Sequence, residues 1–99
     1  MAAQDTKSNQ ERIRELRAQM RGFGVHRAWI FGSRARHSNA PRSDWDILVE
    51  FEANPSFDDF MGLKSMLEDE LKSPVDVLSR NACPPRFLRA IEADLIDVT

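Results

Sequence analysis

The sequence predicts a small α/β domain in which a mixed β-sheet is flanked by helices. Three observations support this fold class. Residues 25–31, 44–51 and 74–79 are short runs rich in β-branched and aromatic side chains, which is typical of strands. The segments before, between and after these runs repeat apolar residues at helical spacing. The resulting order, helix–strand–strand–helix–strand–helix, is that of helices packed around a small sheet.

The bulk properties indicate one ordinary globular domain. The chain has 99 residues, is 41% hydrophobic and carries a net charge of −2. Residues 1–7 are polar, so we expect a flexible tail there and a single domain over residues 8–99. No apolar run reaches membrane-spanning length, and the first residues lack a signal-peptide core, so we expect a cytoplasmic protein without a membrane partner. The acidic balance, with a pI near 5.6, argues against stable nucleic-acid binding.

The first helix is expected over residues 8–20. Ser8 and Glu11 have the spacing of a capping box. Its apolar face is formed by Ile13, Leu16 and Met20. Two glycines, Gly22 and Gly24, are expected to end the helix before the strand at 25–31.

The second half of the chain is expected to alternate helices and strands. A helix over 56–71 would begin at Ser56, with Asp59 as its capping partner. Its apolar stripe consists of Phe60, Leu63, Leu67 and Leu71. A helix over 84–95 begins with two prolines, which are favourable at a helix start, and its apolar positions are Leu88, Ile91 and Leu95. The final residues are expected to add a short strand.

Two aspartates stand at the beginning of the strand at 44–51. Side chains alternate along a strand, so Asp44 and Asp46 share one face with Leu48 and Glu50. The opposite face is an apolar wall formed by Trp45, Ile47, Val49 and Phe51. Neighbouring carboxylates repel one another unless a cation lies between them. The plainer alternative is that Asp44 caps a turn and Asp46 faces water.

A third carboxylate, Asp76, lies within the apolar strand "VDVL". If this strand is buried, its carboxylate needs a partner, either a metal ion or an arginine. If the strand lies beside residues 44–51, three carboxylates converge on one point. Such hard oxygen ligands suit Mg²⁺ or Mn²⁺.

The residues before the acidic pair are suited to binding phosphate. Gly32 and Ser33 follow a strand directly, where a glycine lets the backbone approach a ligand and free N–H groups can hold an anion. A plain turn capped by Ser33 is the alternative. Arg34, Arg36 and Arg42 add positive charge, although for Arg36 we favour simple solvation. Together these parts describe a site for a metal-bound triphosphate.

At this point the residues resemble a known family. The stretch "FGSRARHSNAPRSDWDILVEF", followed by a helix and "PVDVLS", resembles the signature of the DNA polymerase β-like nucleotidyltransferases, and most of all their minimal nucleotidyltransferase (MNT) branch. The resemblance spans about residues 10–97. His37 departs from it, because the branch commonly has glycine there.

This resemblance implies a minimal polymerase β-like fold and two-metal nucleotidyl transfer. Asp44, Asp46 and Asp76 are implied as the catalytic residues and as ligands of two Mg²⁺ ions, with Mn²⁺ as a possible substitute. Gly32, Ser33, Arg34 and Arg42 are implied to bind the nucleotide, with ATP as substrate.

The MNT branch also implies a partner. Its members pair with a HEPN-domain protein as antitoxin and toxin, so the resemblance implies transfer of AMP to a hydroxyl of a HEPN toxin, with tyrosine as the favoured acceptor, within a hetero-oligomer. Two alternatives remain open. The chain could neutralise its partner by binding alone, without catalysis, or it could modify a small-molecule hydroxyl.

Overall fold

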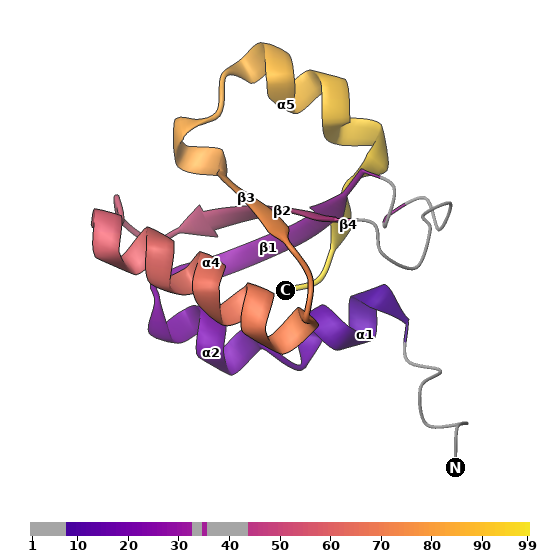
Figure 1. The fold of residues 1–99 in the computed structure, drawn as a ribbon. Helices are drawn as coiled ribbons and strands as arrows, with labels where there is room; N and C mark the ends of the chain where they lie inside the picture. The colour runs from indigo at the N-terminus through magenta and orange to yellow at the C-terminus, as the bar shows by residue number, and fades with distance from the viewer. Residues whose placement is uncertain (1–7, 33–34, 36–43) are drawn as a thin grey trace.

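The protein contains one four-stranded mixed sheet with helices on both faces (Figure 1). The computed structural model describes residues 8–32, 35 and 44–99. The strand order is β3-β2-β1-β4; β2 and β3 are parallel and the other pairs are antiparallel. The strands are β1 (Val25–Phe31), β2 (Trp45–Phe51), β3 (Val75–Ser79) and β4 (Ile96–Asp97). The helices are α1 (Asn9–Arg14), α2 (Arg17–Gly22), α4 (Phe57–Leu71) and α5 (Pro85–Ile91), with single-turn helices η2 (Arg80–Ala82) and η3 (Glu92–Asp94).

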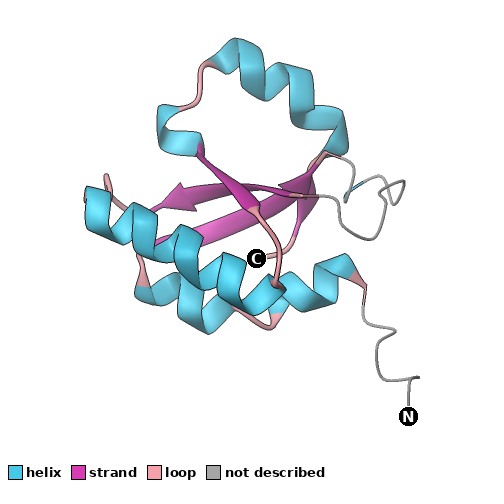
Figure 2. Ribbon diagram, in the orientation of Figure 1, coloured by secondary structure: helices cyan, strands magenta, loops and turns pink. Residues whose placement is uncertain are grey.

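The helices cover the two faces of the sheet unequally. Helices α1, α2 and α4 lie on one face and α5 arches over the other (Figure 2). The larger core lies under the first three helices and contains the apolar wall expected of β2. A smaller core on the α5 side is built from Trp29, Phe31 and Leu48, against which Leu88 and Ile91 pack. The face of β2 that carries the acidic residues is therefore the α5 face, as alternation along the strand predicted.

The expected first helix is in fact two short helices, and the prediction of one continuous helix is wrong. The capping box is confirmed, because the Ser8 Oγ accepts a hydrogen bond from Glu11 N and Ser8 N donates to the Glu11 carboxylate. The helix breaks where Leu16 N donates to Ile13 O, a tightened turn, before α2 resumes. On either side of the break, Arg14 and Arg17 donate to main-chain carbonyls of the C-terminal segment. These contacts with the distant C-terminal segment lie at the break between α1 and α2, which the spacing of the apolar residues did not predict.

The remaining elements agree closely with the sequence. Ser56 Oγ accepts from Asp59 N at 3.0 Å, which begins α4 as expected. The buried residues of α4 are Leu63, Leu67 and Leu71. The helix expected over 84–95 is α5 followed by the 3₁₀ turn η3, and the expected final strand is β4. No helix among the described residues is long and apolar enough to cross a membrane.

A side chain extends the pairing of β2 where β3 ends. The Asn81 amide accepts a hydrogen bond from Phe51 N at 3.0 Å and donates to Phe51 O at 3.2 Å. These two bonds reproduce the pattern of a neighbouring strand, so the end of β2 keeps its partners after the backbone of β3 has turned into η2. The amide thereby joins η2, and the chain leading into α5, to the sheet.

Candidate active site

The fold brings two of the three expected carboxylates together. Asp46 of β2 and Asp76 of β3 are register partners in neighbouring parallel strands, which lie about 4.8 Å apart in a sheet. Both side chains therefore stand side by side on the α5 face. Asp44 precedes β2 by one residue and is exposed, two positions before Asp46. The acidic residues thus gather at the edge of the sheet where β2 and β3 begin.

Gly32 lies directly against this acidic pair. The residue before it, Phe31, is the antiparallel register partner of Asp46, so β1 ends where β2 begins. Gly32 has φ +74°, and a Cβ atom added there would lie 2.3 Å from Asp46 Oδ2. Any other residue would both strain the backbone and displace the carboxylate. The close approach that the structure shows at Gly32 is to a neighbouring side chain, Asp46, and the expected approach to a phosphate ligand stays a prediction.

Asp76 differs from the expectation that it is buried. Its side chain is exposed, because it stands near the start of the edge strand β3, where the described helices leave it uncovered. Because water can solvate this carboxylate, it does not need a charged partner. Among the described residues it forms no ion pair with an arginine. An exposed carboxylate remains accessible to a ligand, so the reason for expecting a function at Asp76 changes from burial to its register with Asp46.

The three carboxylates are suited to a hard divalent cation, although their oxygen atoms do not already surround one point in this structure. Asp44, Asp46 and Asp76 offer only carboxylate oxygens, the ligands that Mg²⁺ prefers. In the part of the chain that the structure describes, no three acidic, histidine or cysteine side chains are grouped closely enough to form a ready-made metal site. A three-carboxylate site therefore requires side-chain rotation at positions that are wholly or partly exposed.

The other predicted nucleotide-binding residues, Ser33, Arg34 and Arg42, lie outside the described residues, as does His37. Of that set, the structure places only Gly32.

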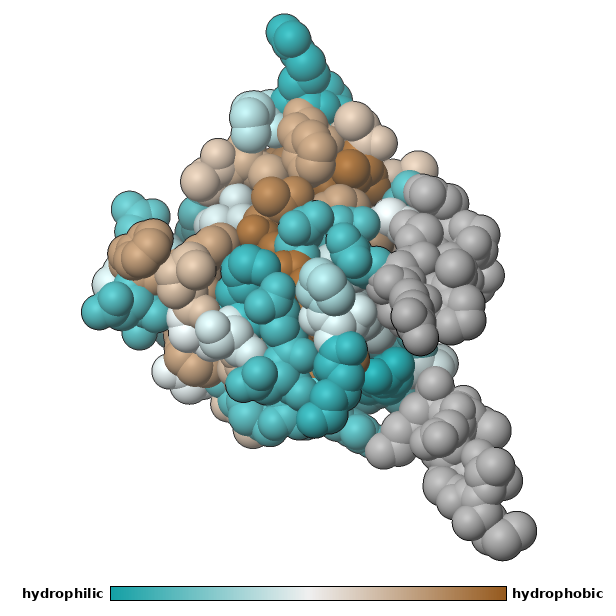
Figure 3. All heavy atoms as spheres, in the orientation of Figure 1, coloured by the Kyte–Doolittle hydropathy of each residue, from teal (hydrophilic) through white to brown (hydrophobic). Residues whose placement is uncertain are grey.

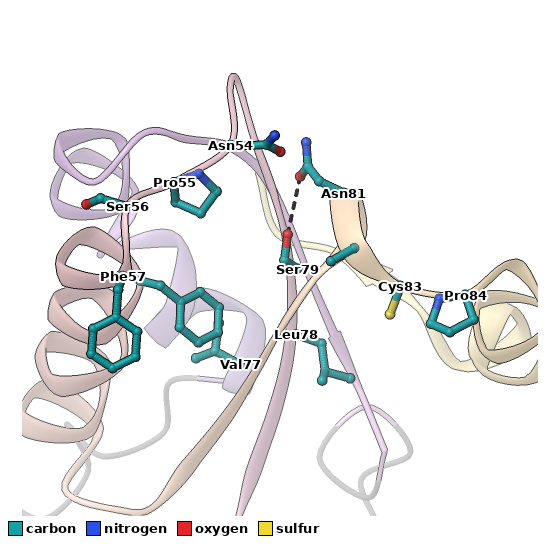
Figure 4. A pocket seen from close by; sticks show the side chains of 12 residues that line it. Asn54, Pro55, Ser56, Phe57, Val77, Leu78, Ser79, Asn81, Cys83 and Pro84 are labelled. Atoms are coloured by element: carbon teal, nitrogen blue, oxygen red, sulfur yellow. Dashed lines mark hydrogen bonds between the residues drawn. The ribbon is translucent and has the colours of Figure 1, made fainter.

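A separate apolar depression lies toward the opposite end of β3 (Figure 4). It has a volume of about 550 Å³ and lies between the start of α4 and the segment around η2. Phe57, Phe60, Leu78 and Cys83 contribute to its walls. No acidic side chain lines it, so this depression is distinct from the acidic site.

Sequence reasoning missed the aromatic contact between β1 and α5. The ring of Phe87 meets the ring of Phe31 edge to face, with centroids 6.3 Å apart and planes at 81°. Phe31 is buried and adjoins the acidic pair through its register with Asp46. The only available sequence signal was an aromatic residue among the first residues of the expected last helix, which by itself does not indicate a neighbour of the site.

A mixed sheet with acidic residues on adjacent strands, and a glycine turn against one of them, is the arrangement of a nucleotidyltransferase. The sequence matches the family model "Polymerase beta, Nucleotidyltransferase" over residues 11–96. The chain belongs to this nucleotidyltransferase family.

Two relatives are named for transfer to protein. A predicted protein adenylyltransferase of Methanocaldococcus jannaschii, MJ0435, is 45% identical over 75 residues, which are 76% of this chain and 81% of the relative. Protein adenylyltransferase MntA of Thermococcus cleftensis is 33% identical over 76 residues, which are 77% of each protein.

Solved structures share the fold. A structure assigned as a minimal nucleotidyltransferase has a TM-score of 0.71 and 30% identity, covering 92% of this chain and 97% of that one. A toxin–antitoxin complex with AMP-PNP has a TM-score of 0.76 at 19% identity, covering 92% and 73%. A tri-AMPylated Shewanella oneidensis HEPN toxin in complex with MNT antitoxin gives 0.68 at 16%, covering 91% and 71%. The last two likenesses show a common fold alone.

Proposed function

We propose that this chain is a protein adenylyltransferase that moves AMP from ATP to a tyrosine hydroxyl of a HEPN-domain toxin and so acts as its antitoxin. The observation that carries the proposal is the register of Asp46 with Asp76, with Gly32 packed against Asp46. The names of the two relatives support adenylyl transfer to protein. The structural neighbours that contain a HEPN toxin or AMP-PNP support the partner and the nucleotide.

The proposed reaction is an in-line displacement at the α-phosphorus of ATP. The acceptor oxygen forms a bond to this phosphorus, the bond to the bridging oxygen of the β-phosphate breaks, and pyrophosphate leaves. In the proposal Asp44, Asp46 and Asp76 hold two Mg²⁺ ions, which supply charge neutralisation on the phosphates when bound. In the proposal Asp76 also helps to activate the attacking hydroxyl by accepting its proton.

The remaining proposed contacts concern the nucleotide. Gly32 and Ser33 contribute main-chain N–H groups to the phosphates, and Arg34 and Arg42 contribute guanidinium groups. Positioning and charge stabilisation are the main catalytic contributions that a protein makes to this class of reaction. A hetero-oligomer with the acceptor protein follows from the proposal, because the acceptor must enter the site.

The test is transfer of label from α-labelled ATP, with Mg²⁺, to the HEPN-domain protein proposed as the partner of this chain. Asp46→Asn should lower the rate at least about hundredfold, in the range seen when one charge-stabilising group is lost. Asp69→Asn is the matched control, because Asp69 is an exposed carboxylate of α4, on the other face of the sheet. Its rate should equal that of the wild type.

Three other results of the labelling assay would contradict parts of the proposal. Equal labelling by wild type and Asp46→Asn would refute the catalytic assignment. A stable complex without any labelled partner would show that the chain neutralises by contact alone. Label on a small-molecule hydroxyl and none on protein would refute the proposed acceptor class.

A further inference from the structure

The outer surface of α5 combines an apolar depression with two arginines. The depression has a volume of about 750 Å³ and is lined by Pro84, Pro85, Arg86, Phe87, Arg89 and Ala90, which we call the α5 surface. Apolar side chains gather over α5 in the upper part of the space-filling view (Figure 3). Phe87 is 38% exposed, although it is a large aromatic residue. An exposed aromatic side chain bordered by arginines is typical of the centre of a protein interface.

The α5 surface adjoins the acidic site. Phe87 contacts Phe31 edge to face, and Phe31 is both the register partner of Asp46 and the residue before Gly32. Helix α5 also packs on the face of the sheet from which Asp46 and Asp76 project, and leaves Asp76 exposed. A molecule bound to the α5 surface therefore lies on the same side of the sheet as the carboxylates. Only the contact between Phe87 and Phe31 separates it from Asp46.

The charges of the α5 surface lack partners within the described part of the chain. Two arginines elsewhere in the described residues do form ion pairs, Arg27 with Asp97 at 3.2 Å and Arg80 with Glu50 at 3.6 Å. Arg86 and Arg89 are exposed and form no ion pair with a described carboxylate. A guanidinium group binds a carboxylate through two parallel hydrogen bonds, so the complementary ligand is acidic.

We propose that the α5 surface docks the protein acceptor through an acidic segment that places one aromatic or aliphatic side chain against Phe87. This inference rests on the proposed function, because it names the surface that presents the acceptor to the carboxylates. Charge complementarity and continuity with the acidic site favour a protein over RNA. Two arginines without an ion pair among the described residues, on a chain of net charge −2, give little of the phosphate neutralisation that nucleic acid requires.

The test is the doubly charge-reversed variant Arg86→Glu/Arg89→Glu, assayed with the HEPN acceptor and α-labelled ATP. We expect kcat/KM for the acceptor to fall about tenfold or more, because like charges then face each other, while the Kd for ATP stays unchanged. Arg21→Glu is matched to the single variant Arg89→Glu, because both arginines are exposed and lie in the last turn of a short helix. Arg21 lies on the other side of the sheet, so its reversal should leave both constants unchanged.

Two further measurements make the inference specific. Raising NaCl from 50 to 500 mM should lower kcat/KM of the wild type and raise that of the double variant, because salt screens the attraction in the first and the like-charge repulsion in the second. Phe87→Ala should weaken acceptor binding about tenfold. Phe57→Ala, which removes an aromatic side chain that is 77% exposed on α4, should not.

The inference and the proposed function fail differently. If the wild type labels the acceptor and the double variant labels it equally well, docking at the α5 surface is refuted and adenylyl transfer stands. If the wild type labels nothing, calorimetric titration with the HEPN protein still tests docking, and loss of affinity in the double variant supports it. Absence of any binding refutes it. A labelled single-stranded RNA that binds the wild type and not the double variant would also overturn a protein ligand.

Discussion

Replacement of Gly32 by alanine tests how closely the turn is fitted to the acidic pair. Alanine at φ +74° costs about 1–2 kcal/mol, because its Cβ crowds the following carbonyl. The same Cβ would lie 2.3 Å from Asp46 Oδ2 and 3.2 Å from its Cγ, so the carboxylate must leave its position. A displaced rotamer adds about 0.5–1.5 kcal/mol. We expect the free energy of unfolding to fall by about 1.5–3.5 kcal/mol in total.

Gly24 provides the matched control. Its φ is +93°, but an added Cβ would meet only Phe51 Cδ1, at the ordinary distance of 3.8 Å. Gly24→Ala should therefore carry a backbone cost of about 1–2 kcal/mol without disturbing a carboxylate. Urea unfolding measures the two stabilities, and transfer of label from ATP measures the two rates. We expect Gly32→Ala to lose most of the rate, and Gly24→Ala to keep the wild-type rate per folded molecule.

The comparison can refute the reasoning in two ways. A wild-type rate in Gly32→Ala would show that the position of Asp46 beside this turn does not matter for the reaction. An equal loss of rate in Gly24→Ala would show that general destabilisation, and not the contact with Asp46, is responsible.

Three further predictions follow from particular side chains. Asp76→Asn should lower the transfer rate about hundredfold and change stability by less than about 0.5 kcal/mol, since Asp76 is exposed; Asp69→Asn should change neither quantity, and a folded, fully active Asp76→Asn would contradict its role. Asn81→Ala should lower the free energy of unfolding by about 1–2 kcal/mol, because two hydrogen bonds at the end of β2 are lost; an unchanged urea midpoint would contradict this. Hydrogen bonds from Lys64 and from a main-chain N–H of β3 hold the pKa of Glu68 below its ordinary value of 4.5. Their stabilisation is complete above that pH and is lost as the pH falls through the lowered folded-state pKa, so Glu68→Gln should flatten the acid side of the stability profile.

Local patterns determine most of this fold, and the sequence therefore predicts most of it. The capping residues Ser8 and Ser56 and the apolar stripe of α4 act over a few residues, so their signals are contained in short segments. The break between α1 and α2 accompanies contacts of Arg14 and Arg17 with the far end of the chain. No local pattern contains that information, and the two short helices were consequently expected as one.

The sequence predicted which acidic residues form the candidate site, but it did not predict the exposure of these residues or their neighbours. The spacing of Asp44 and Asp46, and the alternation along β2, predicted which face carries the acids. The exposure of Asp76 was not predictable, because it depends on β3 being the edge strand, which only the strand order reveals. The contact of Phe87 with Phe31 likewise joins residues more than fifty positions apart.

The topology explains why residues so far apart in sequence meet at one point. Parallel strands begin at the same edge of a sheet, so the starts of β2 and β3 bring Asp46 and Asp76 side by side. Strand β1 is antiparallel to β2, so its end, with Gly32, arrives at that same edge. Only a crossover can make β2 and β3 parallel, and α4 is that crossover. The packing of α4 therefore supports the parallel pairing that brings the acidic pair together. Substitutions of its buried leucines should reduce activity together with stability, although these leucines pack on the opposite face of the sheet from Asp46 and Asp76.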